Sequence, residues 1–347
     1  MPELKEVFDM VTKQTEPDLD SWREQEQRQR STARNRRIGA FALVAAIGVV
    51  AIVIAINTIG ADEVEQTTGR QPIREDATHV VFDLETGSVA PLPTSLAGGF
   101  SYAVSPDGAR FAYSPWPDPI DDDVRLLMYV ANVDGSAVRR VMETFAVDQI
   151  NPRWSPSGQI VYQRRNAFGE EVGNLYLIDP ANGSETRLTD LPEQFSHHWF
   201  MSQSVHPDGQ TILFNLPRGP LEDQSWDLWT IPSTGGELTL VRRNAAHGSY
   251  SPTGTTIAYL ARPGLDGEDF GAGSIWLSEA DGSDPRRLVE GTNISEPRWS
   301  PDGTRIAYVD KGGVYVVDVG TSEASKVIDG GEPEWLDDDT LIVARAG

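Results

Sequence analysis

The chain has 347 residues, 39% of them hydrophobic, which is enough for one large domain or two smaller ones. Its formal net charge of −23 at pH 7 predicts that nucleic acid is not a partner, because an acidic surface repels phosphate. The absence of cysteine excludes disulfides and thiolate metal sites and leaves the redox compartment undecided.

Residues 1–37 are polar and predict a helical tail. Four apolar residues recur at helical spacing: Leu4, Val7, Phe8 and Val11. They predict a short amphipathic helix that ends near Pro17, and residues 20–37 predict a second, solvated helix. The apolar stripe is typical of a helix that lies on a membrane surface or frays, and this interpretation is favoured; the alternative is a docking helix through which residues 1–15 bind a cytoplasmic partner.

Residues 38–60 carry no charge and predict a transmembrane helix, since roughly 20 apolar residues span a bilayer core of about 30 Å. Charged residues flank this segment with opposite signs: Arg28, Arg30, Arg34, Arg36 and Arg37 before it, and Asp62, Glu63 and Glu65 after it. The positive-inside rule therefore predicts a single-pass protein of the cell membrane with a cytoplasmic N-terminus. A retained signal anchor is favoured over a cleaved signal peptide, because the preceding segment is too long. Residues 61–78 are polar, lack periodicity and predict a linker.

A short turn sequence recurs through the rest of the chain. Its five copies are Ser105-Pro106-Asp107-Gly108, Ser155-Pro156-Ser157-Gly158, His206-Pro207-Asp208-Gly209, Ser251-Pro252-Thr253-Gly254 and Ser300-Pro301-Asp302-Gly303. Proline presets φ of the first central position, and glycine takes the left-handed conformation that closes a three-residue hairpin. The copies start 50, 51, 45 and 49 residues apart. A period of this length in a chain of short strands is typical of a β-propeller.

The repeats resemble the WD40-like (PD40) repeat of the TolB-type β-propeller family. The sequences that carry the resemblance are Pro297-Arg298-Trp299-Ser300-Pro301-Asp302-Gly303, with Ile306-Ala307-Tyr308 after it, and Pro152-Arg153-Trp154-Ser155-Pro156. The resemblance covers residues 79–347. TolB-type periplasmic proteins bind lipoprotein and envelope partners, and the resemblance implies partner binding as a class of activity but no particular partner. TolB-type proteins carry an α/β domain ahead of the propeller, whereas here the sequence predicts a tail and an anchor, an arrangement similar to membrane-bound anti-sigma or sensor proteins.

The fold class that the repeats predict is all-β, a six-bladed propeller over residues 79–347. Five complete four-stranded blades are expected to begin near Ser101, Asn151, His198, Ser249 and Glu296. Residues 79–88 have the pattern of the third and fourth strands of a blade, and residues 334–343 have the pattern of the first and second. Pairing of these terminal segments would complete a sixth blade and remove exposed strand edges.

The connections between second and third strands predict a binding face. They are long and unlike one another in four blades, at residues 114–123, 164–174, 216–227 and 262–273, and short in the fifth, at residues 311–313. Acidic and aromatic residues gather in them: Trp116, Asp118, Asp121, Asp122, Asp123, Phe168, Glu170, Glu171, Asp223, Trp226, Asp266, Asp269 and Phe270. This composition favours a basic or cationic envelope protein or peptide as partner, while solvated insertions with no binding role remain the alternative.

No catalytic, cofactor or metal site is expected. Asp121-Asp122-Asp123 lacks the alternating ligand spacing and the loop glycine of a calcium site. His197 and His198 are adjacent in a predicted strand, so at most one of them faces a given centre. No Gly-x-Ser-x-Gly nucleophile elbow occurs.

Two functions from different classes remain. The first is an anchored binding module, a receptor, scaffold or sensor that signals through its tail. The second is a propeller enzyme that acts on envelope glycan or peptide, which would bring acidic or histidine side chains together at the inner ends of the blades. The first-strand residues expected to line the channel are aromatic, namely Trp154, Trp299, Trp335 and Tyr250, so the binding module is favoured.

Overall fold

The computed structural model describes residues 77–96, 99–115, 127–142, 147–166, 173–191, 202–218, 225–261 and 273–346. The predicted tail and transmembrane segment lie outside these ranges, so they stay predictions. Within the ranges all regular structure is β-strand, and no helix long and apolar enough to cross a membrane is found there.

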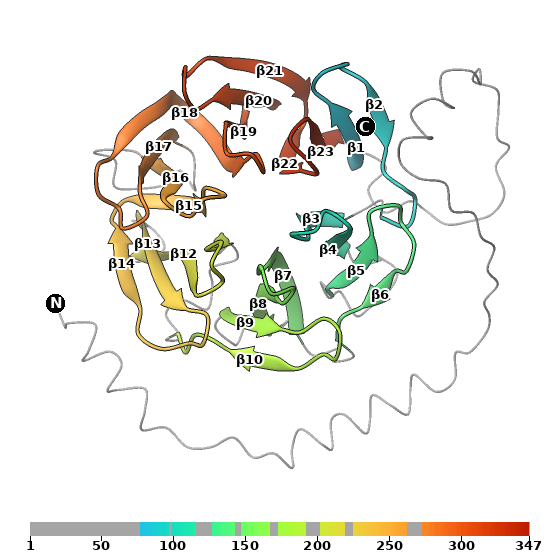
Figure 1. The fold of residues 1–347 in the computed structure, drawn as a ribbon, viewed down its shortest axis with the longest axis vertical. Helices are drawn as coiled ribbons and strands as arrows, with labels where there is room; N and C mark the ends of the chain where they lie inside the picture. The colour runs from blue at the N-terminus through green and yellow to red at the C-terminus, as the bar shows by residue number, and fades with distance from the viewer. Residues whose placement is uncertain are drawn as a thin grey trace, which may run out of the picture. The chain divides into compact units, whose positions relative to one another are not determined.

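The described strands follow one another around a ring in four-stranded antiparallel units, which we call blades 1 to 6 (Figure 1). Blade 1 contains β3 (Gly99–Val104), β4 (Arg110–Pro115), β5 (Tyr129–Asn132) and β6 (Arg139–Arg140). Blade 2 contains β7 (Val147–Trp154), β8 (Ile160–Asn166), β9 (Asn174–Ile178) and β10 (Glu185–Arg187). Blade 3 contains β11 (Gln203–Val205), β12 (Thr211–Arg218), β13 (Ser225–Pro232) and β14 (Thr239–Arg242).

Blades 4 and 5 form one seven-stranded sheet that divides at β18. The strands of this sheet are β15 (Ala245–Tyr250), β16 (Thr256–Ala261), β17 (Gly273–Glu279), β18 (Arg286–Trp299), β19 (Arg305–Asp310), β20 (Gly313–Asp318) and β21 (Ala324–Asp329). The first part of β18 pairs with β17 and its last part pairs with β19. One long strand therefore serves as the last strand of blade 4 and the first strand of blade 5.

Blade 6 joins the two ends of the described chain. It contains β22 (Gly331–Trp335), β23 (Thr340–Ala346), β1 (Ala77–Asp83) and β2 (Val89–Pro91), and β1 pairs with β23 from Ala77↔Ala346 to Asp83↔Thr340. In Figure 1 the blue strand β1 lies beside the red strand β23. The predicted closure by terminal strands is confirmed, and it leaves no unpaired edge between the first and last segments.

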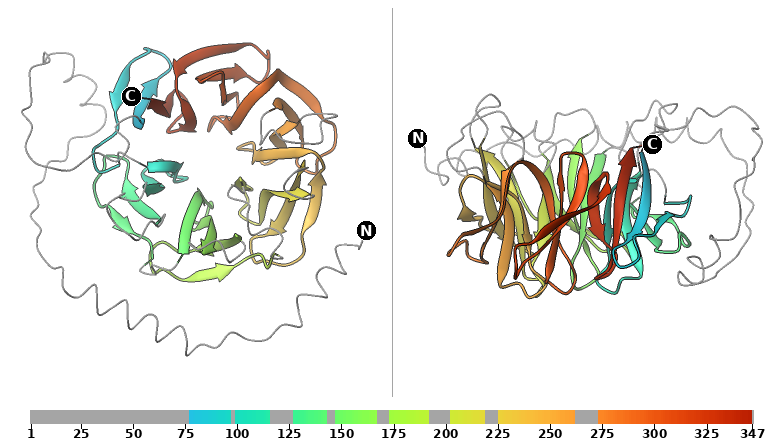
Figure 2. Two further views of the ribbon diagram at one scale, coloured as in Figure 1. Left: turned by 180° about the vertical axis from the view of Figure 1, so that it is seen from behind. Right: turned by 90° about the horizontal axis from the view of Figure 1, so that it is seen from above.

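The first strands of the blades surround the centre of the ring. They are β3, β7, β11, β15, the end of β18 and β22, and each of them contacts the next around the circle. The fourth strands lie at the periphery (Figures 1 and 2). Residues of the first strands are therefore the ones that can reach the axis.

The predicted turns close one end of the ring. In each of the five copies the glycine N–H donates to the carbonyl of the residue three positions earlier, at 2.8–2.9 Å. The glycines have φ between +69° and +82°, the left-handed region that the sequence predicts. The hydroxyl of Ser105 also donates to Asp107, and this hydrogen bond is the main reason that the pKa of Asp107 lies below its usual value.

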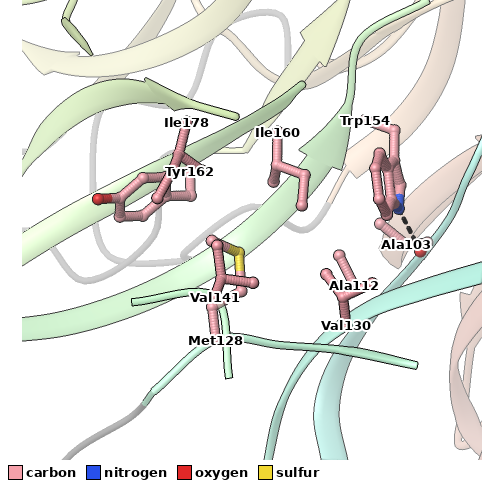
Figure 3. Close-up of a cluster of buried hydrophobic side chains, with 9 residues drawn as sticks. All are labelled: Ala103, Ala112, Met128, Val130, Val141, Trp154, Ile160, Tyr162 and Ile178. Atoms are coloured by element: carbon pink, nitrogen blue, oxygen red, sulfur yellow. Dashed lines mark hydrogen bonds between the residues drawn. The ribbon is translucent and has the colours of Figure 1, made fainter. Parts of the chain in front are cut away.

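Tryptophans of the first strands tie neighbouring blades together. Trp154 Nε1 donates to the carbonyl oxygen of Ala103 at 3.0 Å, from blade 2 to blade 1, and the ring packs among the apolar side chains between those blades (Figure 3). Trp299 and Trp335 make the equivalent bonds to the preceding blades. Burial of the indole and a satisfied N–H together make these residues part of the frame.

Candidate functional site

The two ends of the ring differ in what the strands lead into. Because every first strand turns into its second strand at one end, the second strands finish at the opposite end, which we call the loop end. From it the connections 116–128, 167–173, 219–224 and 262–272 depart, whereas blade 5 has only Lys311 and Gly312 there. The strand pairing places the strand ends that flank the four connections at a common end of the ring, while the predicted binding face itself stays a prediction.

The residues that the sequence predicts as a partner site lie outside the described residues, with one exception. Trp226 belongs to β13 and is half-buried opposite Pro217 of β12, at the loop end. The remaining residues stay predictions: Trp116, Asp118, Asp121, Asp122, Asp123, Phe168, Glu170, Glu171, Asp223, Asp266, Asp269 and Phe270.

The connection in blade 3 is shorter than predicted. The ladder between β12 and β13 continues to Arg218↔Ser225, so the expected loop 216–227 narrows to residues 219–224. Asp227 is 3% exposed, its carboxylate lies 3.6 Å from Arg218 Nε, and it accepts a hydrogen bond from the N–H of Asn244 at 2.9 Å. Asp227 therefore has a structural role at the base of this connection. The alternation of polar and apolar residues in the sequence around it does not predict its burial or its partners.

The aromatic residues expected at the centre do not line it. Trp154, Trp335 and Tyr250 are at most 8% exposed and belong to cores between or within blades, and Trp299 packs against such a core. The expectation is wrong because successive residues of a strand face opposite ways. The indoles turn towards the preceding blade, which leaves the polar residues around them to face the centre.

Each of four first strands carries a bulge three residues before its terminal aromatic residue. The residues at this position have left-handed φ angles between +50° and +55°: Asn151, His247, Glu296 and Glu332. The strand register shifts next to all four. A non-glycine residue in this region costs on the order of 1 kcal/mol or more. The same strained bulge therefore recurs in four blades, and at each bulge the residue lies outside the regular strand pairing.

Charged side chains from the first strands gather around the centre. We call them the axial cluster, which consists of Arg153, His247, Glu296, Arg298, Glu332 and Glu334. Arg298 Nε lies 3.5 Å from Glu334 Oε2, and both side chains are 20% exposed. Glu332 is 46% exposed and its Oε2 lies 3.9 Å from Nε2 of the buried His79. Acidic and histidine side chains thus do meet at the inner ends of the blades.

The surroundings of three members of the axial cluster shift their pKa values. Burial lowers the pKa of Arg153 to about 10, assisted by the positive charge of Arg298 and opposed by Glu334 and Glu296. Burial lowers the pKa of His247 to about 4, again assisted by Arg298, so this ring is neutral at pH 7. Burial also raises the pKa of Glu296, assisted by Glu332 and Glu334 and opposed by the two arginines. Because Arg153 and Arg298 belong to blades on opposite sides of the ring, the charges interact across its centre.

The recurrent sequence Pro-Arg-Trp contains the signal that could have found this cluster. The residue before the aromatic is Arg153 in blade 2, Arg298 in blade 5 and Glu334 in blade 6. A charged residue at an equivalent position of the innermost strand is costly to bury without a partner. In the sequence alone these arginines serve only to identify the repeat.

No metal site emerges from the described part of the chain, where no three His, Asp or Glu side chains lie close enough to hold an ion. His197 and His198 lie outside the described residues. His79 is 5% exposed and its ring packs on Tyr102 with centroids 4.8 Å apart. His206 lies beside Asp208 in its turn.

Comparison with solved structures shows a TolB-like β-propeller. The putative TolB of Agrobacterium tumefaciens matches with a TM-score of 0.61 at 19% identity over 78% of this chain and 98% of that one. TolB of Acinetobacter baumannii matches with a TM-score of 0.55 at 16% identity over 80% and 78%. Hydrazine synthase of Kuenenia stuttgartiensis matches with a TM-score of 0.55 at 16% identity over 79% and 47%. No protein-family model matches the sequence.

These identities are all below 25%, so the likeness concerns the fold alone. The expected TolB-like propeller is thereby confirmed. Because the similar structures carry names of different kinds, one of them that of a synthase, the fold does not choose between a binding module and an enzyme.

Proposed function

We propose that this chain is a membrane-anchored, extracytoplasmic binding module whose propeller presents the loop end to a basic or cationic envelope protein or peptide. The observation that carries the proposal is the difference between the two ends of the ring. One end is closed by five near-identical hydrogen-bonded turns, and the other releases four connections that differ in length and sequence. Variable connections on a rigid frame are where binding residues concentrate.

Charge supports a cationic partner. The four connections carry the acidic and aromatic residues identified in the sequence, and the basic residues ahead of the apolar segment 38–60 support a cytoplasmic tail. A complementary charge accelerates encounter, and aromatic side chains supply the anchors. Signalling through residues 1–15 would follow from partner binding outside the membrane.

Crosslinking and capture from membranes with the full-length chain tests this function. The loop-end variant replaces Asp121, Asp122 and Asp123 with Asn. A matched control removes three exposed carboxylates from turns at the other end, by Glu85→Gln, Glu237→Gln and Glu323→Gln. We expect one envelope protein to be captured by the wild type and the control, to be reduced with the loop-end variant, and to be weakened at high salt. Equal capture of the envelope protein by the loop-end variant and the control would exclude the loop end as the binding surface.

The axial cluster supports an enzyme as the second candidate. Glu296 has a raised pKa and the neutral His247 lies on the neighbouring blade, which are the properties of a general acid and a general base. Its test is turnover of peptidoglycan fragments and envelope peptides by the full-length chain. Turnover by the wild type that is lost in each of the variants Glu296→Gln and His247→Asn would favour the enzyme. If the wild type shows no turnover, the enzyme is excluded as a candidate function.

A further inference from the structure

The axial cluster contains two charges of opposite sign that the described residues leave without an ion pair. Arg298 is paired with Glu334. Glu296 makes neither a hydrogen bond nor an ion pair with a described residue and feels the arginines only at longer range. Arg153 bonds only to main-chain carbonyls, those of Pro152 at 2.8 Å and Tyr102 at 3.3 Å.

The guanidinium of Arg153 is held in place by hydrogen bonds that use only some of its N–H donors. Both of its hydrogen bonds come from Nη1, so among the described residues Nε and Nη2 have no acceptor. These two atoms form the edge that binds a carboxylate through two parallel hydrogen bonds. The two main-chain bonds fix the orientation of this edge in advance, which lowers the entropic cost of binding an anion.

The opposite side of the centre is acidic. Glu296 of blade 5 and Glu332 of blade 6 occupy equivalent bulge positions with φ of 53° and 50°. Blade 2, which carries Arg153, lies across the ring from blade 5 (Figure 1). The centre therefore presents two carboxylates to one side and a guanidinium to the other, a pattern that complements a molecule with one positive and one negative group.

The first strands of blades 3 and 4 also contain buried polar atoms without a partner among the described residues. Gln203 is 3% exposed, and its Nε2 donates to the carbonyl oxygen of Asn151, which places the amide at the level of the bulges. Its Oε1 is buried without any hydrogen-bond partner, and so is the hydroxyl of Ser249 on β15. Such atoms are rare in folded proteins because each one costs free energy.

We propose that the axial cluster binds a small zwitterion, a free amino acid or a short peptide, with its carboxylate on Arg153 and its ammonium group between Glu296 and Glu332. The ring of His247 is neutral at pH 7, so it adds no positive charge that would compete with the ammonium group. This inference concerns a site separate from the loop end and does not depend on the function proposed there.

Equilibrium dialysis of the full-length chain in detergent gives the first test. The probe is an equimolar mixture of the protein amino acids with di- and tripeptides of glycine and alanine, and retained compounds are identified by mass spectrometry. The peptides separate the two terminal charges by increasing distances, so the retained length distinguishes amino acid from peptide. Retention of no zwitterion by the wild type would overturn the proposal.

Calorimetry with the retained compound then assigns each charge. Glu296→Gln and Arg153→Met should each weaken binding at least about tenfold, the loss of one charge-assisted hydrogen bond. The matched controls Glu290→Gln and Arg287→Met remove an exposed ion pair of β18 and should leave binding unchanged. The N-acetyl derivative of the retained compound lacks the ammonium charge, so it should bind weakly and its affinity should not change with Glu296→Gln. The methyl ester lacks the carboxylate charge, so it should bind weakly and its affinity should not change with Arg153→Met.

Unchanged affinity in both cluster variants would contradict the assignment. Circular dichroism establishes whether each variant is folded. If either one unfolds, Glu332→Gln decides, because this carboxylate is 46% exposed and its replacement leaves the core intact. Partner capture at the loop end is measured separately, so the two proposals can fail independently.

Discussion

The blade interfaces and the centre of the ring are built from neighbouring residues of the same strands, yet they obey different rules. Trp154 is buried and its N–H is satisfied by Ala103, whereas Arg153 beside it is partly exposed and bonds only to main-chain carbonyls. Alternation along a strand sends the first towards the preceding blade and the second towards the axis. The face of the first strands that points to the preceding blade is therefore apolar and hydrogen-bonded, whereas the face that points to the axis carries charges that are only partly paired.

The difference between the blade interfaces and the centre shows where a propeller can place charged residues without losing the packing that holds its blades together. The interfaces fold because apolar surface is removed from water and polar atoms are satisfied. The centre tolerates strained bulges and weakly paired charges because the surrounding blades determine their positions. Four predictions test this division.

Loss of an interface tryptophan should have the largest effect. Trp154→Ala should lower the free energy of unfolding by about 3–5 kcal/mol, because it leaves a cavity between blades 1 and 2. Trp154→Phe is the matched control and should cost only about 1–2 kcal/mol, since it keeps most of the ring volume and loses the bond to Ala103. Urea unfolding measures both. Equal costs would mean that the hydrogen bond, rather than packing, joins the blades.

Acid should act through His247. Its folded pKa of about 4 lies below the ordinary 6.5, so the unfolded chain binds more protons between these values and stability falls as the pH drops through this window. The loss amounts to about 2–3 kcal/mol, at about 1.4 kcal/mol for each pKa unit and allowing for partial exposure. His247→Asn should remove this component, and asparagine tolerates the left-handed backbone. Urea unfolding at pH 7 and pH 4 compares the two chains, and equal acid sensitivity would contradict the burial of the imidazole.

The ion pair at the centre should be stronger than one at the surface. In a double-mutant cycle Arg298→Met and Glu334→Gln should show a coupling energy of about 1 kcal/mol, because both groups are only 20% exposed. The pair Arg287–Glu290 is 48% and 77% exposed and should give about 0–0.5 kcal/mol. Thermal and urea unfolding provide the energies. A larger coupling for the surface pair would break the distinction.

Removal of the unpaired carboxylate should have the smallest effect, and its sign is opposite. Because the folded pKa of Glu296 is raised, the folded chain binds more protons, and stability falls as the pH rises from its ordinary value of 4.5 through the raised value. Glu296→Gln should therefore raise the free energy of unfolding at pH 7 by about 0.5–1 kcal/mol. Destabilisation by this variant would show that Glu296 has a structural partner. A gain in stability together with a loss of zwitterion binding would be typical of a functional residue.

Much of the frame was predictable from local sequence. Pro301 and Gly303 favour a tight turn through their own backbone preferences, and four further copies at regular spacing imply blades, which the strand pairing bears out. The terminal segments around Val81 and Ile342 were also matched correctly, because each has half of the blade pattern.

The candidate site was predicted less well. The connections were found, but the ladder of β12 and β13 reaches further than the sequence suggests, since Pro217 and Trp226 lie opposite each other in it. The axial cluster was missed, because period-two alternation does not state which face of a strand points to the axis, and the bulge at Glu296 changes the phase of that alternation.

The sequence by itself determined the turns, the repeat, the closure and the class of fold, because these depend on local backbone preferences and on a pattern repeated along the chain. Only the tertiary structure decided which side chains meet at the centre. Arg153 and Glu296 are far apart in the chain, and their interaction depends on how blades 2 and 5 face each other across the ring. Charge interactions of this kind arise from the closed arrangement of all the blades, so no single repeat contains them.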